Sequence, residues 1–354
     1  MDVALLISGG VDSSVALAQL VADGHRVRAF YLKIWLEDEM AHLGSCPWGD
    51  DVAHARSVCE KFGIPFEIIP MQQAYWERIV SYVIETIKIG HTPNPDILCN
   101  QHIKFGAFYE AIGKEFDAIA TGHYAQARHK DGHSHLFCSP DLVKDQTYFL
   151  SRLSQEQLSR ALFPIGHLTK EELRTEAARL NLPNATRKDS QGICFLGKIK
   201  FTDFIRYHVG EKPGELIEFE TGKVIGKHPG FWFYTIGQRQ GIGLSGGPWY
   251  VVAKETSHNR VFISRNYYTP DKERTECIID NCNWFITTPV AHTHYTVKLR
   301  HGPRRHHATL SSLPDGKFRL KLTDENDQGI APGQYAVVYE ENECLGGGII
   351  QEKA

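Results

Sequence analysis

Residues 3–20, VALLISGGVDSSVALAQL, contain the feature that most limits the folds open to this chain. Residues 3–7 are wholly apolar and partly β-branched, which predicts a strand buried on both faces, as in a parallel sheet. Apolar residues then recur at helical spacing from Val11 to Leu20, and Gly24 is a plausible end of that helix. A glycine turn therefore joins a buried strand to a helix.

The turn itself, SGGVDSS at 8–14, has two interpretations. It is either a glycine turn capped by Asp12 or Ser13, as in many strand–turn–helix units, or a site for a phosphate. Gly9 and Gly10 let a ligand approach the backbone closely, and the N–H groups at a helix N-terminus favour an anion. The complete SGGVDS sequence directly after the first strand favours the phosphate site.

The alternation of strand and helix patterns continues to about residue 200. Strands are predicted at 27–32, 66–69 and 118–121, and helices at 52–62, 75–89 and 103–115. This order predicts an α/β fold with a doubly wound parallel sheet, in which ligands lie at the carboxyl ends of the strands. SGGVDS and the TGHY sequence at 121–124 both fall at such ends.

From about residue 210 the pattern changes to glycine, proline, aromatic residues and short alternating runs. Strands are predicted at 249–252, 260–263, 295–299, 318–322 and 335–339. We therefore expect three domains: a catalytic domain at 1–205, a small and mostly β linking domain at 206–272, and a C-terminal β-barrel at 273–354.

Composition excludes several classes of protein. The net charge is −3, so any contact with nucleic acid must use a local patch of positive charge. No apolar run approaches ~18 residues and position 2 is acidic, so we expect neither a membrane span nor a signal peptide. The eight cysteines form no CxxC pair, which argues against a zinc ribbon and for reduced thiols in the cytoplasm.

Two common nucleotide-binding motifs are also excluded. The GxGxxG match at 241–246 follows polar residues and precedes Pro248, so it lacks the strand and the helix of a dinucleotide site. No GxxxxGK[ST] sequence occurs, which excludes a Walker-type ATPase.

Two cysteine-containing segments are candidates for chemistry. In HTPNPDILCNQHIKF at 91–105, Asp96 and Cys99 would share a helical face close to a helix N-terminus, which favours a thiolate. The alternative there is a buried structural cysteine beside a capping aspartate. In TRKDSQGICFLG at 186–197, Cys194 follows a basic, glycine-containing loop that could carry it into a site, but a buried strand explains it at least as well.

The densest basic cluster is LRHGPRRHH at 299–307. Such a run is usually a solvated face of the protein. On a β-barrel in a net-acidic chain, it is also a candidate for contact with the phosphates of a nucleic acid.

Together and in this order, these segments resemble the family of tRNA-specific 2-thiouridylases, within the superfamily of PP-loop ATP pyrophosphatases. The resemblance covers nearly the whole chain, and SGGxDS alone would indicate only the superfamily. TPNPDILCN with KDSQGICF is far more specific to the family. The matching segments are SGGVDSS (8–14), YLKIW (31–35), TPNPDILCN (92–100), KFGAF (104–108), ATGHY (120–124), KDQTYFL (144–150), LFPIG (162–166), KDSQGICF (188–195), TIGQRQGIG (235–243), PWYVV (248–252) and CLGGGII (344–350).

The resemblance implies ATP-dependent 2-thiolation of the wobble uridine of tRNA. ATP, with Mg²⁺, would adenylate O2 of the uridine and release pyrophosphate, and sulfur would then come from a cysteine persulfide. The implied ATP-binding residues are Leu6, Ile7, Ser8, Gly9, Gly10, Val11, Asp12, Ser13, Leu32 and Gly122.

The resemblance also implies roles in sulfur transfer and in binding of the tRNA. Cys194 would carry the persulfide, Cys99 would be the nucleophile that forms a transient disulfide with it, and Asp96 would be the acid/base. The flipped target base would contact Asn94, Pro95 and Asp96, and the tRNA would contact His123, Lys144, Asp145, Gln146, Arg300, His301 and Gln334. The implied partners are tRNA and a persulfide donor, either a cysteine desulfurase or a relay protein.

Other functions on the same fold stay open at this point. Asp96, Cys99 and Cys194 could ligate an iron–sulfur cluster that holds the sulfur, although four thiolates are the usual ligand set. The chain could also be another PP-loop adenylating enzyme, which needs no reactive cysteine, or a tRNA-binding module without catalysis.

Overall fold

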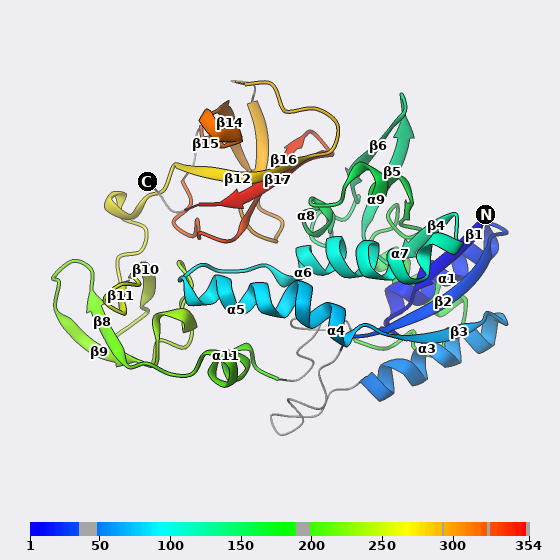
Figure 1. Ribbon diagram of the computed structural model, residues 1–354, viewed down its shortest axis with the longest axis horizontal. Coiled ribbons are helices and arrows are strands. Elements are labelled where there is room, and N and C mark those ends of the chain that lie inside the picture. Colours follow the sequence, from blue (N-terminus) through cyan, green and yellow to red (C-terminus); the bar gives the residue numbers. More distant parts are fainter. Residues whose placement is uncertain (35–47, 189–198, 292–293, 324–325, 352–354) are drawn as a thin grey trace.

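The computed structural model describes residues 1–34, 48–188, 199–291, 294–323 and 326–351. Three regions follow one another along the chain (Figure 1). An N-terminal α/β region lies at one end of the molecule, a small sheet lies at the other, and a β-barrel lies beside the helices that connect them. The predicted fold class, an α/β domain followed by a linking domain and a barrel, is confirmed.

The N-terminal region is built on a five-stranded parallel sheet in the order β3-β2-β1-β4-β7. The chain leaves β1 toward β2 on one side and β4 on the other, so the carboxyl ends of β1 and β4 form a topological switch point. The strands are β1 (Asp2–Leu6), β2 (Arg26–Lys33), β3 (Phe66–Pro70), β4 (Ala118–Thr121) and β7 (Ala161–Leu162).

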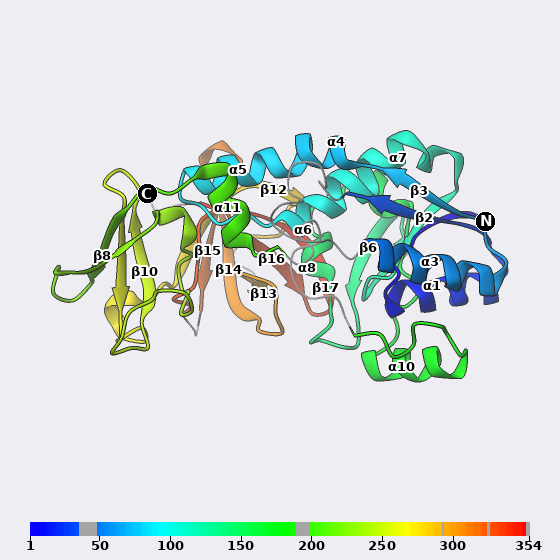
Figure 2. The ribbon, with the colours of Figure 1, turned by 90° about the horizontal axis from the view of Figure 1, so that it is seen from below.

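Helices cover both faces of this sheet (Figure 2). Along β1, Val3 and Leu5 pack on one face and Ala4 and Leu6 on the other, so the strand is buried on both faces and its sequence is continuously apolar. The first face carries α1 (Val11–Ala22), α3 (Trp48–Phe62) and α10 (Lys170–Arg179), and the second carries α4 (Gln72–Tyr75), η2 (Trp76–Val80), α5 (Ser81–Lys88), η3 (Cys99–Ala107) and α7 (Phe108–Ala111).

The helix predicted over 103–115 begins earlier than expected. It starts at α6 (Pro95–Leu98), continues through the nine-residue π-helix η3 and α7, and ends with η4 (Gly113–Glu115). Asn94 caps the first turn, because its side-chain oxygen accepts a hydrogen bond from the N–H of Ile97 at 3.3 Å, and proline fits the first helical position. π-Helical turns are rare and often lie at functional sites.

The C-terminal region is a closed antiparallel barrel of six strands. Five neighbouring pairs give the order β12-β15-β14-β13-β16-β17, and β12 also pairs with β17, which closes the barrel. The strands are β12 (Glu276–Trp284), β13 (His294–Lys298), β14 (His306–Ser312), β15 (Phe318–Leu322), β16 (Tyr335–Glu340) and β17 (Glu343–Ile350), with η7 (Pro314–Gly316) between β14 and β15.

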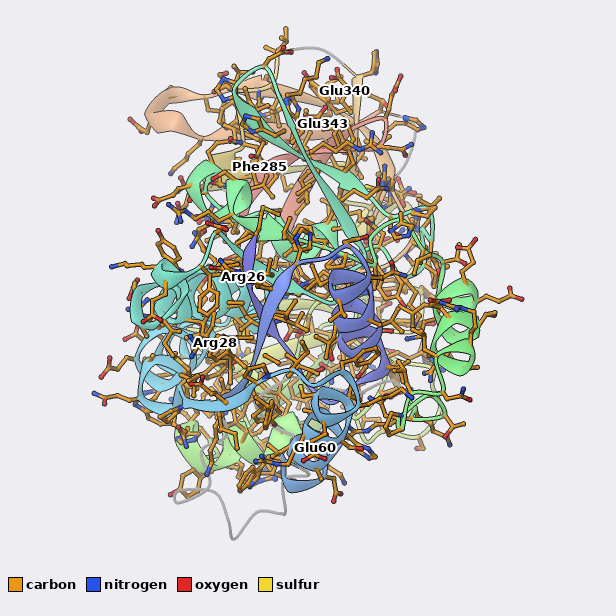
Figure 3. All side chains as sticks on the ribbon, turned by 90° about the vertical axis from the view of Figure 1, so that its right-hand side faces the viewer. Arg26, Arg28, Glu60, Phe285, Glu340 and Glu343 are labelled. Atoms are coloured by element: carbon orange, nitrogen blue, oxygen red, sulfur yellow. The ribbon has the colours of Figure 1, made fainter. Side chains whose placement is uncertain are left out.

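A hairpin of the N-terminal region extends the sheet of the barrel. Strands β5 (Ala125–Lys130) and β6 (His133–Cys138) pair with each other, and β6 pairs with β17 through Leu136 and Cys344. Figure 3 shows Glu340 and Glu343 at the turn between β16 and β17, close to this hairpin. The N-terminal and C-terminal regions are therefore joined by continuous backbone pairing. The short helices α8 (Thr147–Leu150) and α9 (Gln155–Ser159) follow the hairpin.

The middle region is a four-stranded sheet in the order β10-β11-β8-β9. Residues 241–246, the GxGxxG match, lie in the loop before β10, in keeping with the exclusion of a dinucleotide site. The elements are α11 (Phe201–Val209), β8 (Gly214–Glu218), β9 (Val224–His228), η5 (Phe231–Phe233), β10 (Tyr250–Glu255), β11 (Arg260–Ser264) and η6 (Pro270–Lys272).

The segment after α5 touches all three regions (Figure 1). The N–H of Thr92 donates to the carbonyl of Pro332 in the barrel region at 2.8 Å. The ammonium of Lys254 in the middle region donates to the carbonyl of Gly90, and the hydroxyl of Thr92 donates to the hydroxyl of Thr235 at 3.2 Å. The residues that lead into α6 are thus fixed by both later regions. Within the described ranges, the model contains no helix long and apolar enough to cross a membrane.

Candidate functional site

The turn between β1 and α1 is shaped for an anion. Gly9 has a φ of +74°, and a Cβ atom at this position would collide with the carbonyl oxygen of Asp51, so only glycine fits there. Gly10 is the N-cap of α1, and no described side chain caps this helix. The first N–H groups of α1, with the positive end of its dipole, are therefore directed toward the space beyond the turn.

Serine hydroxyls hold the turn in this shape. Ser13 Oγ accepts a hydrogen bond from the N–H of Ser8 at 3.2 Å and donates to the carbonyl of Gly10 at 3.0 Å. The hydroxyls of Ser8 and Ser13 lie 3.3 Å apart, and Ser14 Oγ donates to the same carbonyl of Gly10 at 3.0 Å. The loop is thus pre-organised, which reduces the cost of binding a phosphate group.

Asp12, in the first turn of α1, is held by two groups from distant segments. Its Oδ1 accepts hydrogen bonds from the hydroxyl of Tyr124 at 3.0 Å and from the ammonium of Lys170 at 2.7 Å. The side chain of Lys170 is 17% exposed and that of Asp12 is 33% exposed. A fixed cation and a fixed carboxylate therefore lie side by side at the rim of the loop.

The outer side of the loop is fixed by residues from the segment after α10. Asn184 donates to the carbonyl of Gly9 at 2.8 Å and to Ser14 Oγ at 2.9 Å. Arg187 donates to the same carbonyl at 3.0 Å and forms an ion pair with Asp51. Lys170 and Arg187 thus both lie at the glycine turn, each paired with a carboxylate, of Asp12 and of Asp51.

The carboxyl end of β4 lies against the same loop. A Cβ atom on Gly122 would lie 2.8 Å from the backbone nitrogen of Ser13, so β4 and α1 approach each other as closely as glycine allows. The next residue, His123, is buried, and its Nδ1 lies 2.7 Å from the hydroxyl oxygen of Thr121. Burial, with a contribution from the charge of Lys104, holds the pKa of His123 well below its usual value, so the ring is neutral at pH 7.

The helix that carries Cys99 lies next to this end of the sheet. Cys99 is buried in the apolar cluster that also contains Leu6, the last residue of β1, and Leu32 of β2 packs against that cluster. One residue later, the amide of Asn100 donates to the carbonyl of Phe149 at 3.0 Å and its oxygen accepts from the ammonium of Lys104 at 2.9 Å. Helix η3 also contacts α4, which follows the carboxyl end of β3, so part of η3 lies at the same end of the sheet as the glycine turn.

The segment before Cys99 is fixed from the barrel side. The amide of Gln334 donates to the carbonyls of Thr92 and Pro93, at 3.0 and 3.1 Å. Asn94 and Pro95 are buried, and Asp96 is partly exposed in the first turn of the helix. Cys194, the other predicted sulfur-carrying residue, lies in 189–198, outside the described residues.

Two comparisons with known proteins, with family models and with relatives, cover nearly the whole chain. The family model described as "tRNA methyl transferase HUP domain" matches residues 1–198, its PRC-barrel domain matches 202–265, and an "Aminomethyltransferase beta-barrel domain" matches 274–350. Proteins called tRNA-specific 2-thiouridylase are 47% identical in Porphyromonas gingivalis and 46% identical in Parabacteroides distasonis, each over 99% of both chains. The chain belongs to the tRNA-specific 2-thiouridylase family. A solved 4-thiouridine synthetase with RNA and ATP matches 59% of this chain and 50% of that one, with 16% identity and a TM-score of 0.34.

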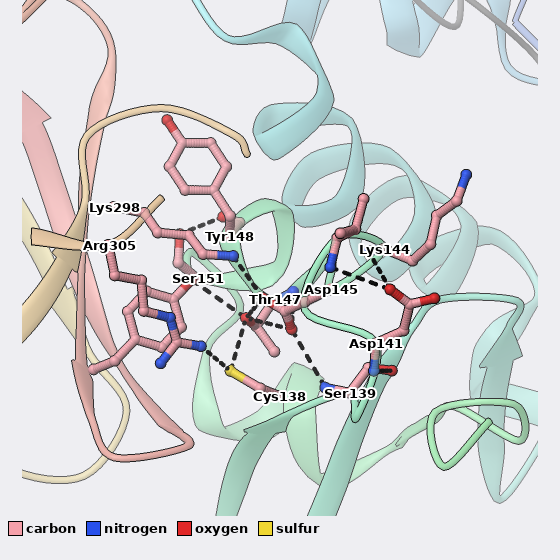
Figure 4. A network of polar contacts seen from close by, with 12 residues as sticks. Cys138, Ser139, Asp141, Lys144, Asp145, Thr147, Tyr148, Ser151, Lys298 and Arg305 are labelled. Carbon is pink, nitrogen blue, oxygen red and sulfur yellow. Dashed lines mark hydrogen bonds and ion pairs between the residues drawn. The ribbon is translucent and has the colours of Figure 1, made fainter. Parts of the chain in front are cut away.

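Two of the residues that the family resemblance assigns to tRNA, Lys144 and Asp145, lie at the junction of the N-terminal region and the barrel (Figure 4). Gln146 accepts a hydrogen bond from the N–H of Tyr124 at 3.0 Å, just after the carboxyl end of β4. The ring of His301 lies 4.4 Å from the ring of Phe149, and burial lowers its pKa. Arg300 donates to the carboxylate of Asp327 at 2.6 and 2.8 Å, yet its side chain stays 51% exposed.

The resemblance implies that Asp145 contacts the tRNA, whereas in the structure Asp145 does not reach the surface. Its side chain is fully buried, and its carboxylate pairs with the ammonium of Lys298 in the barrel at 2.8 Å. A carboxylate would also repel the phosphates of an RNA. The structure therefore places Asp145 in the interior. Arg305 of the basic cluster is likewise engaged internally, since it donates to Cys138 Sγ at 2.9 Å and to the carbonyl of Glu341 at 2.8 Å.

Proposed function

We propose that this protein adenylates O2 of the wobble uridine of tRNA with ATP and then replaces that oxygen by sulfur. The observation that carries the proposal is the approach of two elements at one end of the parallel sheet. The phosphate loop, residues 8–13, follows β1, and Cys99 is buried in the same apolar cluster as Leu6, the last residue of that strand. A base placed between them would meet an activating nucleotide on one side and a sulfur on the other.

The family models are named for methyl transfer and the relatives for 2-thiolation. The geometry favours thiolation. An uncapped helix N-terminus with ordered serine hydroxyls and two flanking cations suits a leaving pyrophosphate, which methyl transfer does not produce. A cysteine close to the N-terminus of a helix, which begins only four residues earlier, suits a sulfur nucleophile.

For the first step, the loop residues 8–13 would hold the phosphates of ATP, and Lys170 and Arg187 would balance their charge. The donor set also fits Mg²⁺, because Asp12 offers a carboxylate of the kind that holds this ion together with substrate phosphates. When bound, Mg²⁺ would neutralise charge on the leaving pyrophosphate. Attack of O2 on the α-phosphorus of ATP releases pyrophosphate and joins AMP to O2. The C2–O bond of the uridine can then break with AMP as the leaving group.

For the second step, Cys194 would carry a persulfide supplied by a cysteine desulfurase or a relay protein. Attack of the Cys99 thiolate on the inner sulfur forms a Cys99–Cys194 disulfide and releases hydrosulfide. Hydrosulfide then attacks C2 and displaces AMP, and Asp96 would accept the remaining proton. A thiol reductant restores both cysteines, which suits a reducing compartment such as the cytoplasm.

The tRNA would lie across the junction of the N-terminal region and the barrel. Lys144, Gln146, Arg300 and His301 would contact it there, with His123 and Gln334 closer to the target base. Asn94, Pro95 and Asp96 would line the place of the flipped base, since a stacked base exposes too little of C2 for attack.

The test is a reaction of the purified protein with unmodified tRNA, ATP and a persulfide donor, a cysteine desulfurase with its cysteine substrate, followed by mass spectrometry of the tRNA nucleosides. We expect 2-thiouridine together with one pyrophosphate per sulfur, and neither product when ATP or tRNA is omitted. Methylated nucleosides, or ATP-independent thiolation, would contradict the proposal. Anaerobic purification with an absorbance scan separates the cluster-dependent alternative, which predicts a brown protein and loss of activity on removal of iron.

A further inference from the structure

A buried ion pair crosses from the N-terminal region to the barrel (Figure 4). Asp145 lies between β6 and α8, and Lys298 is the last residue of β13. Their side chains are 0% and 1% exposed, and Lys298 Nζ lies 2.8 Å from Asp145 Oδ2. Two opposite charges have thus been removed from water at the contact between two regions.

Groups at the ends of the loop between β6 and α8 also donate hydrogen bonds to the carboxylate of Asp145. Besides Lys298, the hydroxyl of Thr147 lies 3.0 and 2.9 Å from its two oxygens, and the N–H groups of Ser139 and Thr147 donate to Oδ1 at 3.4 and 3.5 Å. These donors come from both ends of the loop between β6 and α8. The carboxylate therefore ties the two ends of that loop together and fastens them to β13.

A second set of contacts lies beside the pair. The hydroxyl oxygens of Thr147 and of Tyr339 in β16 lie 3.2 Å apart. The guanidinium of Arg305 lies 4.3 Å from the centre of the Tyr339 ring and donates to Cys138 Sγ at 2.9 Å. The pair is thus enclosed by side chains of both regions, which fixes the direction of each charged group.

The neighbours of the pair in sequence are the residues proposed to contact tRNA. Lys144 and Gln146 flank Asp145, and Arg300 and His301 follow Lys298 by two and three positions. The ring of His301 packs on Phe149 of α8 at 4.4 Å, so the two segments also touch beyond the pair. Any change in how Asp145 meets Lys298 therefore changes the separation of these two segments.

We propose that Asp145 and Lys298 are positioning residues that hold two tRNA-contacting segments, 144–146 and 300–301, at a fixed separation. This inference rests on the proposed function. When two contact segments are held at a fixed separation, an RNA bound to one of them is already close to the other. If the separation is no longer fixed, the effective concentration of the RNA at the second segment falls. Loss of the pair should weaken binding of tRNA without changing the chemistry of bound tRNA or the affinity for ATP.

The experiment compares the wild type with Lys298→Met, Asp145→Asn and the double variant that carries both. Each single variant leaves the other charged side chain buried without its partner. The double variant removes both charges together and is therefore expected to be the more stable protein. We expect the folded double variant to show a tRNA Kd raised by roughly tenfold, an unchanged Kd for ATP, and a kcat within about twofold of wild type at saturating tRNA. The conservative Lys298→Arg, which keeps the charge and shifts its position, should show a smaller rise in tRNA Kd.

A second measurement tests the link between the two segments directly. Lys144→Ala should weaken tRNA binding less in the double-variant background than in the wild type, because the segment is no longer held beside Arg300. An unchanged tRNA Kd in the folded double variant, or an equal loss in kcat and in ATP affinity, would overturn the inference. If neither neutral variant folds, Lys298→Arg decides, and a wild-type tRNA Kd for it would count against the role.

Binding is measured without turnover, so this test and the test of the proposed function fail in different ways. A wild type that binds tRNA and forms no thiouridine would contradict the proposed function, and the comparison of Kd values would still decide the role of the pair. A wild type that thiolates tRNA, with variants that bind it normally, would leave the function standing and remove the inference.

Discussion

One methyl group at position 122 is expected to disable the phosphate loop while the fold persists. Gly122 follows β4 directly, and a Cβ atom on it would lie 2.8 Å from the backbone nitrogen and 3.0 Å from the Cα of Ser13. Both atoms belong to the first turn of α1, so they have none of the freedom with which a side chain rotates away. Gly122→Ala must therefore push β4 and the start of α1 apart.

The size of the effect follows from the cost of overpacking, which is about 1–3 kcal/mol for an added methyl group in a well-packed site. If this cost falls on the conformation that binds phosphate, the affinity for ATP falls by a factor of roughly 5 to 150, since ~1.4 kcal/mol is a factor of ten. Equilibrium dialysis gives the Kd for ATP, and tRNA-dependent release of pyrophosphate gives the effect on activity.

Gly113→Ala is the matched control. A Cβ atom there would lie 3.0 Å from Ile119 Cδ1 and 3.2 Å from Tyr109 Cδ2, which are side-chain atoms on the second face of the sheet. This variant is expected to lose some thermal stability and to keep its affinity for ATP. A folded Gly122→Ala protein with wild-type affinity for ATP would refute the assignment of this loop to the nucleotide.

The remaining predictions concern charge, sulfur and pH. Lys170→Met should reduce pyrophosphate release by about tenfold, because a charge-assisted hydrogen bond to Asp12 is worth roughly 1.5–3 kcal/mol, and wild-type rates would remove Lys170 from the site. With a persulfide donor as the sulfur source and no free sulfide, Cys99→Ser should abolish thiolation and retain tRNA-dependent pyrophosphate release. Under the same conditions Cys194→Ser should abolish thiolation and leave tRNA binding intact, and residual thiolation by either variant would refute its role. Burial lowers the pKa of His123, so as the pH falls the unfolded protein takes up a proton at this residue, near pH 6.5, before the folded protein does. The free energy of unfolding should therefore fall as the pH drops below about 6.5. Urea unfolding of wild type and His123→Gln at pH 7.5 and 5.5 should show a smaller fall for the variant; equal falls would contradict this.

The sequence was sufficient for the elements whose pattern is local. The apolar run of β1, the glycine turn and the helical spacing of α1 all lie within 20 residues. The apolar run indicates a buried strand, the glycines indicate a turn, and the spacing indicates a helix. Three barrel strands, β13, β15 and β16, were predicted from short alternating runs, whereas β12, β14 and β17 were not. The hairpin of β5 and β6 was not predicted, although its Asp131-Gly132 turn, with both φ values positive, is the usual signal for one.

The rest of the site depends on contacts that sequence spacing does not encode. Lys170 meets Asp12 across 158 positions and Asn184 meets Gly9 across 175, so the fold must be known before either is recognised. Burial of Asp145 likewise follows from the approach of the barrel, whose Lys298 lies 153 positions away. The early start of the helix before Cys99 had a local signal, since Asn94 followed by Pro95 is a typical N-terminus.

The central claim is that ATP activates the same oxygen that sulfur replaces. The most direct measurement uses tRNA in which O2 of the wobble uridine carries ¹⁸O, with ATP and sulfide, and mass spectrometry of the AMP released. We predict that each AMP formed with a 2-thiouridine contains one ¹⁸O atom. Unlabelled AMP alongside thiolated tRNA would contradict the account.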